Sequence, residues 1–251
     1  MLLRFYLDRV RLERYKLTVT LLCLAISLSA CSLWNTGKTP STHLATQTLP
    51  HNHLNYVALG ASDGWGTGAR DPDEQNWPVD LAHKFGNQTH LVNLGIPGIT
   101  LHDALNVELP VALDVHPNLV TIWLAVDDLL ANTPLDSYTH DLDLLLTRLE
   151  TTTPDGHIAL ANIPDLTLLP RFRTENQTTK ASLQSQVTAY NASIAEVAQH
   201  HQVMLIDLYK EWNLIINHPE YISSDGFHPS TRGYAQLAEI FYQTLKTIAD
   251  L

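Results

Sequence analysis

The chain has 251 residues, of which 45% are hydrophobic and 16% are charged, a balance typical of a soluble globular enzyme with one well-buried core. Its formal net charge is −11 at pH 7, which argues against nucleic acids and anionic lipid surfaces as partners. Neutral or cationic substrates suit that charge. The only cysteines are Cys23 and Cys31, so no intramolecular disulfide is expected beyond residue 31.

Residues 1–30 are predicted to form a signal peptide. Five basic side chains precede residue 17, and the apolar stretch 17–30 is uncharged and too short to span a membrane comfortably. The segment Leu28-Ser29-Ala30-Cys31 resembles the lipobox of bacterial lipoproteins, in which the cysteine is lipidated. That resemblance implies an exported protein, lipid-anchored through Cys31 to the outer face of the bacterial cell membrane. An uncleaved N-terminal anchor and an ordinary secretory signal remain alternatives.

Residues 31–54 are rich in threonine and also contain serine and proline, with no apolar period. This composition predicts a flexible tether between the lipidated N-terminus and the following domain. The domain is expected to span residues 55–251.

From Tyr56 onward, short apolar runs alternate with longer helical patterns, which predicts a parallel sheet covered by helices on both faces. The expected strands are Tyr56–Gly60, His90–Leu94, Asn118–Ala125, His157–Asn162 and Val203–Leu208. The expected helices are Gln75–Phe85, Leu101–Leu109, Ser137–Thr152, Thr178–His200 and Thr231–Ile248. Together they predict an α/β fold, a three-layer α/β/α sandwich around a five-stranded parallel sheet.

Four polar or glycine-containing segments follow the predicted strands. Ser62 comes after the first strand, Gly95 after the second and Asp127-Asp128 after the third, whereas Asp225 and His228 share a loop before the last helix. Ligands of such sheets bind at the carboxyl ends of the strands. We therefore expect these segments to meet at one rim.

Ser62, Asp225 and His228 are the residue types that a serine hydrolase requires. Acyl transfer at neutral pH needs a hydroxyl nucleophile, an imidazole that takes its proton and a carboxylate that orients the imidazole, in any chain order. Each residue alone has a simpler interpretation as a turn former, a helix cap or a surface histidine. Their joint placement at predicted strand ends favours a catalytic triad.

The pattern over residues 56–250 resembles the SGNH, or GDSL-like, hydrolase family of lipases and esterases. The matching blocks are Gly60-Ala61-Ser62, Asn93-Leu94-Gly95, Ala125-Val126-Asp127-Asp128 and Asp225-Gly226-Phe227-His228. The resemblance implies the flavodoxin-like SGNH fold and a serine esterase that uses Ser62, His228 and Asp225 on carboxylic esters. Acyl or acetyl esters, lysophospholipids and thioesters are all possible substrates. The backbone N–H groups of Ser62 and Gly95 would stabilise the oxyanion.

The third block departs from the family pattern, which has Gly-x-Asn-Asp with an asparagine that donates to the oxyanion. This chain has Ala125 and Asp127 instead, and Ala61 replaces the aspartate that usually precedes the serine. An ionised Asp127 would repel the oxyanion. The alternative function is therefore a surface-anchored ligand-binding module with weak or lost catalysis. We interpret Asp128 as a residue that orients loop backbone groups.

The 13 histidines, including His200-His201, show no metal-ligand spacing, and solvated helix faces explain them more simply. We expect no metal and no cofactor. Trp65 and Trp123 flank the catalytic blocks and are either subsite or core residues. The sequence does not indicate an oligomeric state.

Overall fold

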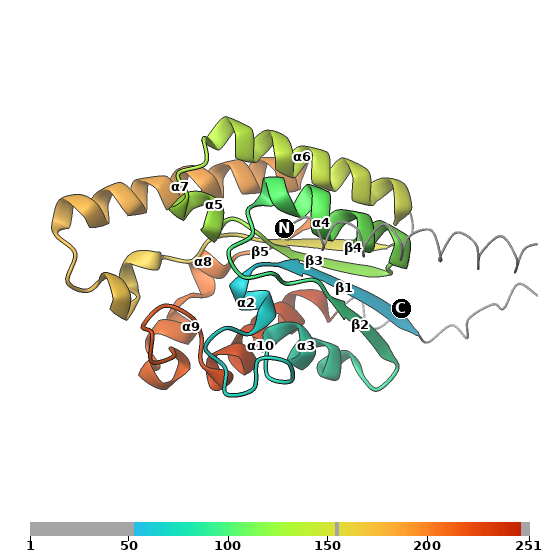
Figure 1. Cartoon of the computed structure of the whole chain (residues 1–251), viewed down its shortest axis with the longest axis horizontal. Coiled ribbons are helices and arrows are strands. Elements are labelled where there is room, and N and C mark those ends of the chain that lie inside the picture. Colours follow the sequence, from blue (N-terminus) through green and yellow to red (C-terminus); the bar gives the residue numbers. More distant parts are fainter. Residues whose placement is uncertain (1–52, 154–155, 247–251) are drawn as a thin grey trace, which may run out of the picture. The chain divides into compact units, whose positions relative to one another are not determined.

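The computed structural model describes residues 53–153 and 156–246. The predicted signal peptide, Cys31 and nearly all of the tether lie outside these residues. The strands are β1 (Leu54–Gly60), β2 (Thr89–Asn93), β3 (Leu119–Trp123), β4 (His157–Ala161) and β5 (Met204–Ile206). They form one parallel sheet in the order β2-β1-β3-β4-β5 (Figure 1). The predicted five-stranded parallel sheet is confirmed.

Long helices cover both faces of the sheet (Figure 1). Helices α4 (Leu101–Val115), α6 (Leu135–Thr152) and α7 (Gln177–His200) lie on one face, and α3 (Trp77–Phe85) and α10 (Thr231–Leu245) lie on the other. The shorter helices, which the sequence did not predict, are α2 (Ser62–Trp65), α5 (Val126–Leu130), α8 (Leu208–Glu211) and α9 (Asn213–Ile216). Single 3-10 turns span Leu166–Leu168, Pro170–Phe172 and Pro219–Tyr221. Among the described residues, no helix combines the length and apolarity needed to cross a membrane.

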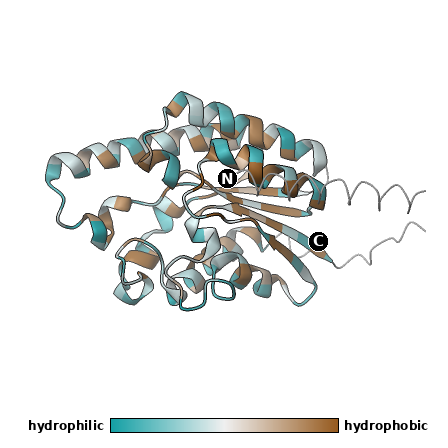
Figure 2. Ribbon diagram, in the orientation of Figure 1, coloured by the Kyte–Doolittle hydropathy of each residue, from teal (hydrophilic) through white to brown (hydrophobic). Residues whose placement is uncertain are grey.

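The core follows the apolar runs of the strands, which are the brown arrows of Figure 2. Every residue of β3 is buried, as expected for a central strand covered on both sides. On the α3 and α10 side, the rings of Trp77 and Phe241 stack with centroids 4.2 Å apart, and Trp123 packs beside them. Trp123 is thus a core residue, 5% exposed, whereas Trp65 is 49% exposed.

Side-chain caps fix where several helices begin. Asn76, Thr100, Asn176 and Ser230 each accept a backbone N–H of the first turn of α3, α4, α7 and α10. The predicted end of α4 at Leu109 was wrong, because the helix passes Pro110 and continues to Val115. Its buried stripe continues beyond the proline at Ala112, so burial outweighs the missing hydrogen bond.

Helix α4 also places a carboxyl group in the core. Glu108 is 1% exposed, and neither of its carboxylate oxygens has a hydrogen-bond partner among the described residues. Burial is the main cause that raises the pKa of Glu108 to about 8. Glu108 is therefore mostly protonated at neutral pH.

Candidate active site

Ser62 is the first residue of α2 and follows directly from the buried end of β1. Small residues let this turn pack against the segment after β2, because a Cβ at Gly95 would lie only 2.6 Å from the carbonyl carbon of Gly64. The N–H groups of the first helical turn have no intrahelical acceptor. The backbone N–H of Ser62 is therefore available to a ligand beside its own hydroxyl.

The structure brings Ser62, His228 and Asp225 together in one line of hydrogen bonds. The Ser62 Oγ lies 3.0 Å from the Nε2 of His228, and the Nδ1 of His228 lies 2.7 Å from the Oδ2 of Asp225. The hydroxyl therefore donates to Nε2 while Nδ1–H donates to the carboxylate, which is the tautomer that a general base requires. The His228 side chain is 16% exposed, so a substrate can reach it.

Asp225 is held in its ionised form by the loop around it. Its Oδ1 accepts the Ser223 hydroxyl at 2.7 Å and the backbone N–H groups of Phe227 and His228 at 2.8 and 3.0 Å. Partial burial raises its pKa, but the hydrogen bond from His228 and these three donors outweigh that effect and hold the pKa of Asp225 well below its usual range. Gly226 has a φ of 72°, a turn conformation that favours glycine.

The acid–base loop is closed at both ends before α10 begins. The N–H of Ser223 donates to the carbonyl of His228 at 2.8 Å, and the N–H of Ser230 donates to the carbonyl of Tyr221 at 2.7 Å. Ser230 then caps α10. His228 is thus positioned by a turn anchored to a long helix whose inner face is buried.

Two further carboxyl groups, Asp63 and Asp127, lie close enough to the His228 imidazole to interact with it electrostatically. Burial raises the pKa of Asp63 to about 6, and His228 and the Tyr234 hydroxyl offset only part of that rise. Burial also raises the pKa of Asp127, and His228 partly counters it. Asp63 was not identified as a site residue from the sequence, although a carboxylate directly after the nucleophile was the available signal.

The geometry disagrees with the oxyanion role expected for Gly95. Its N–H already donates to the side chain Oδ1 of Asn93 at 3.1 Å, and a Cβ at Gly95 would lie 2.6 Å from the Trp65 nitrogen. Gly95 is therefore a packing glycine. Gly98 in the same loop is exposed and has a φ of 78°, and a Cβ added to it would contact no other atom. The loop is anchored by the Ile96 N–H, which donates to the carbonyl of Gly60.

Asp128 links helix α5 to the segment between β2 and α4. It is 1% exposed, and its Oδ2 accepts the N–H of Leu101 at 2.8 Å at the start of α4. This contact agrees with the expected role in orienting loop backbone. It also fixes α5, and therefore Asp127, against the loop that contains Gly98.

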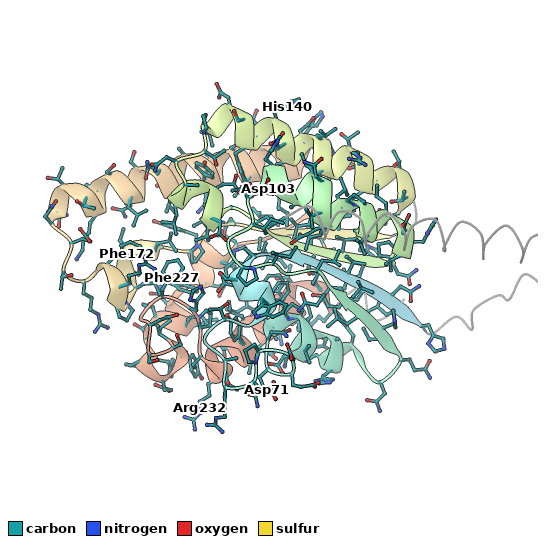
Figure 3. All side chains as sticks on the ribbon, viewed as in Figure 1. Asp71, Asp103, His140, Phe172, Phe227 and Arg232 are labelled. Atoms are coloured by element: carbon teal, nitrogen blue, oxygen red, sulfur yellow. The ribbon has the colours of Figure 1, made fainter. Side chains whose placement is uncertain are left out.

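Apolar side chains lie on the loops that contain the site residues, and the Phe227 ring lies against His228. Phe227 and Phe172 lie beside each other with ring centroids 6.2 Å apart (Figure 3), and the Arg171 guanidinium lies over the Phe227 ring. Exposed large apolar residues occur on the segments that follow β1, β2, β3 and β4, namely Trp65, Ile96, Leu130 and Leu168. A cavity of about 20 Å³ next to Asp63 and Phe227 has room for roughly one water molecule.

Comparisons with known proteins bear on the family and the fold. Residues 58–236 match the GDSL-like Lipase/Acylhydrolase family. An arylesterase of Vibrio mimicus is 27% identical over 191 residues, which cover 74% of this chain and 86% of that protein. The TesA crystal structure has a TM-score of 0.63 at 21% identity and covers 78% of this chain and 99% of TesA. Esterase EstA from Pseudoalteromonas sp. has a TM-score of 0.61 at 18% identity and covers 79% and 100%. The chain belongs to the GDSL-like lipase/acylhydrolase family.

Proposed function

We propose that the protein is a serine esterase that hydrolyses carboxylic esters through Ser62, His228 and Asp225. The observation that carries the proposal is the continuous hydrogen-bond line from the Ser62 hydroxyl through His228 to an ionised Asp225. Ser62 Oγ attacks the acyl carbonyl while His228 takes its proton. His228 then protonates the departing alcohol, and a water molecule, deprotonated by His228, releases the acid from the acyl-enzyme.

The oxyanion is assigned to backbone donors on two neighbouring segments. The N–H of Ser62 lies in an uncapped first helical turn, and Gly98 lies in the exposed loop after β2 with a φ of 78°. Asp127 supplies a third donor if it is protonated, and burial favours that form. We therefore assign the second backbone donor to the oxyanion to Gly98 instead of Gly95.

The substrate class that fits the site best is an ester with an apolar or aromatic alcohol part. The exposed Trp65, Ile96 and Leu168 and the Phe172–Phe227 pair provide apolar contact surface at the strand ends. The arylesterase relative supports the same choice. Acetylated glycans, lysophospholipids and thioesters are the alternative substrates to include in the test.

The test is labelling with a fluorophosphonate probe followed by an ester panel that varies acyl length and alcohol. Wild type and the control Ser137→Ala, at an exposed position on α6, should both react and turn over. Ser62→Ala should do neither. A wild type that resists the probe and binds esters without turnover would instead support the binding-module alternative.

The proposed setting is the outer face of a bacterial membrane, with a lipid on Cys31 as the anchor. Support comes from the sequence alone, through the apolar segment and Leu28-Ser29-Ala30-Cys31. Cys31→Ala should release the protein from the membrane fraction or block its maturation. Continued membrane association after removal of the N-terminal segment would contradict a lipid anchor.

A further inference from the structure

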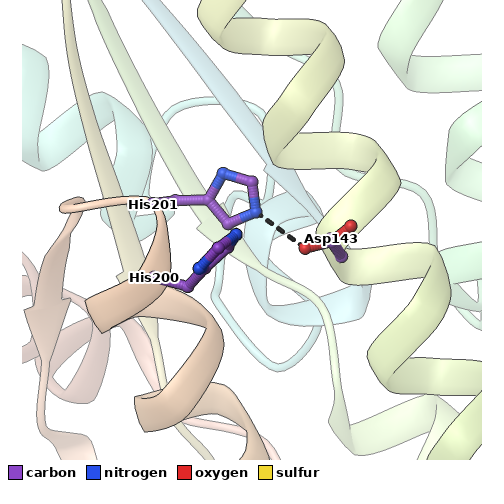
Figure 4. A group of neighbouring side chains, drawn as sticks. All are labelled: Asp143, His200 and His201. Carbon is purple, nitrogen blue, oxygen red and sulfur yellow. Dashed lines mark hydrogen bonds and ion pairs between the residues drawn. The ribbon is translucent and has the colours of Figure 1, made fainter.

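A second group of chemically active side chains lies far from Ser62 in the sequence, where α6 meets the end of α7. Asp143 belongs to α6, His200 ends α7, and His201 follows it (Figure 4). One ligand atom from each residue lies within 4.8 Å of the others. Asp143 and His201 already touch, with Oδ1 and Nε2 3.0 Å apart.

His201 is buried between two carboxylates. Its Nε2 faces Asp143, while its Nδ1 lies 3.0 Å from the Oε1 of Glu150, and only 6% of its side chain is exposed. A neutral imidazole has one N–H and one lone pair, so one of its nitrogens would point a lone pair at a carboxylate oxygen. One of the two contacts therefore lacks a hydrogen atom between nitrogen and oxygen, and a metal ion placed there would be bound by both atoms.

The side of the cluster that faces solvent is open and acidic. A groove of about 630 Å³ is lined by Asp136, His140, Asp143, Glu196 and His200 among others, and within the described part of the chain no lysine or arginine lines it. The cluster also stands at the carboxyl end of the 24-residue helix α7, where the helix dipole favours cations. Charge and access both suit a small cation.

We propose that Asp143, His200 and His201 bind a divalent transition metal ion, with Zn²⁺ as the best match to two imidazoles and one carboxylate. The Nε2 of His201 and the Oδ1 of Asp143 would ligate the ion, and Glu150 would accept the Nδ1–H of His201, the arrangement usual for metal-bound histidines. His200 would complete three protein ligands, and water would occupy the position that faces the groove. The ion would tie α6 to α7.

The proposal is tested by calorimetric titration of Zn²⁺ into the metal-free full chain, with Co²⁺ absorption as a probe of coordination. Wild type should bind one equivalent and show a higher Tm with Zn²⁺. His200→Gln and Asp143→Asn should each weaken Zn²⁺ binding at least about tenfold. The control His218→Gln removes an exposed histidine that also contacts one carboxylate, Glu220, and should bind as wild type does.

Ester hydrolysis at saturating substrate should be the same for His200→Gln and wild type, so failure of this site is separable from failure of the esterase. His200 is exposed, and its replacement should leave the fold intact, which circular dichroism can verify. Absence of stoichiometric Zn²⁺ binding to wild type would overturn the metal site. Equal Zn²⁺ binding by wild type and both cluster variants would overturn it too.

Discussion

Two imidazoles in this molecule are enclosed by oxygen atoms in nearly the same geometry but with different chemistry. His228 has the Ser62 hydroxyl at 3.0 Å on one nitrogen and the Asp225 carboxylate at 2.7 Å on the other. His201 has carboxylates at 3.0 Å on both nitrogens. A hydroxyl can donate to a lone pair, whereas a carboxylate cannot.

This difference separates a base from a cation site. Between a hydroxyl and a carboxylate, the neutral imidazole satisfies both partners and is ready to accept a proton. Between two carboxylates it satisfies only one, and a metal ion placed at the other contact would be bound by both atoms. The oxygen on the second nitrogen therefore decides what each histidine does.

The largest expected effect comes from removing the hydroxyl partner of His228. Ser62→Ala should lower kcat by about 10⁴-fold or more, because the nucleophile and its base act as one unit. His228→Ala should cost about as much, and the double variant little more than either alone. Steady-state kinetics on one aryl ester, with Ser137→Ala as control, measures this. Substantial turnover by Ser62→Ala with an unchanged fold would contradict the assignment of Ser62 as nucleophile and His228 as its base.

The next largest effect is expected from replacing the carboxylate that contacts the Nδ1 of each histidine, Asp225 for His228 and Glu150 for His201. Asp225→Asn should lower kcat by about 10³ to 10⁴-fold, since the amide stabilises the wrong tautomer. The matched change Glu150→Gln, beside His201, should leave kcat unchanged and weaken Zn²⁺ binding. Kinetics and calorimetry on both variants give the two readouts. A large loss of kcat in Glu150→Gln would contradict the separation of roles.

A smaller effect on kcat/KM is expected from replacing Asp127, which stands where the family pattern has the asparagine that donates to the oxyanion. Because burial raises the pKa of Asp127, its neutral form extends to higher pH than usual and is lost as the pH rises further. Asp127→Asn should equal wild type at low pH and exceed it, by up to about tenfold, in alkaline solution. The pH profile of kcat/KM for both forms decides this. Impairment of Asp127→Asn at every pH would show that the carboxyl group itself is required.

The smallest expected effect concerns a positioning residue. Ser223→Ala removes one of the three donors to Asp225 Oδ1 and leaves the two backbone donors in place. We expect kcat to fall about threefold with KM unchanged, since one hydrogen bond among several is lost. Threonine, which keeps the hydroxyl, should restore the rate. Equal rates for all three forms would show that the backbone donors suffice.

Strand periodicity and turn residues were enough to predict the sheet, because buried parallel strands are continuous apolar runs such as Leu119–Trp123. Ser62, Asp225 and His228 could be predicted as site residues because each lies in a loop at the carboxyl end of the predicted sheet, where such loops converge. The hydrogen bond that occupies Gly95 was not predictable, since it depends on the rotamer of Asn93. The Asp143–His201 contact was missed because its partners come from different helices, and spacing within one segment cannot reveal it.

The buried Glu108 implies that folding is coupled to proton uptake. Its pKa is about 8 in the folded chain against 4.5 ordinarily, so near pH 7 the unfolded chain is ionised there while the folded chain holds a proton. Stability should therefore decline as the pH rises from about 5 to 8, and Glu108→Gln should flatten that decline. Because the proton comes from the buffer, the calorimetric heat of refolding should differ between buffers of small and large ionisation enthalpy. The contribution of Glu108 to stability is therefore greatest in mildly acidic solution, whereas that of Asp225 is complete above its ordinary pKa and is lost only in more acidic solution.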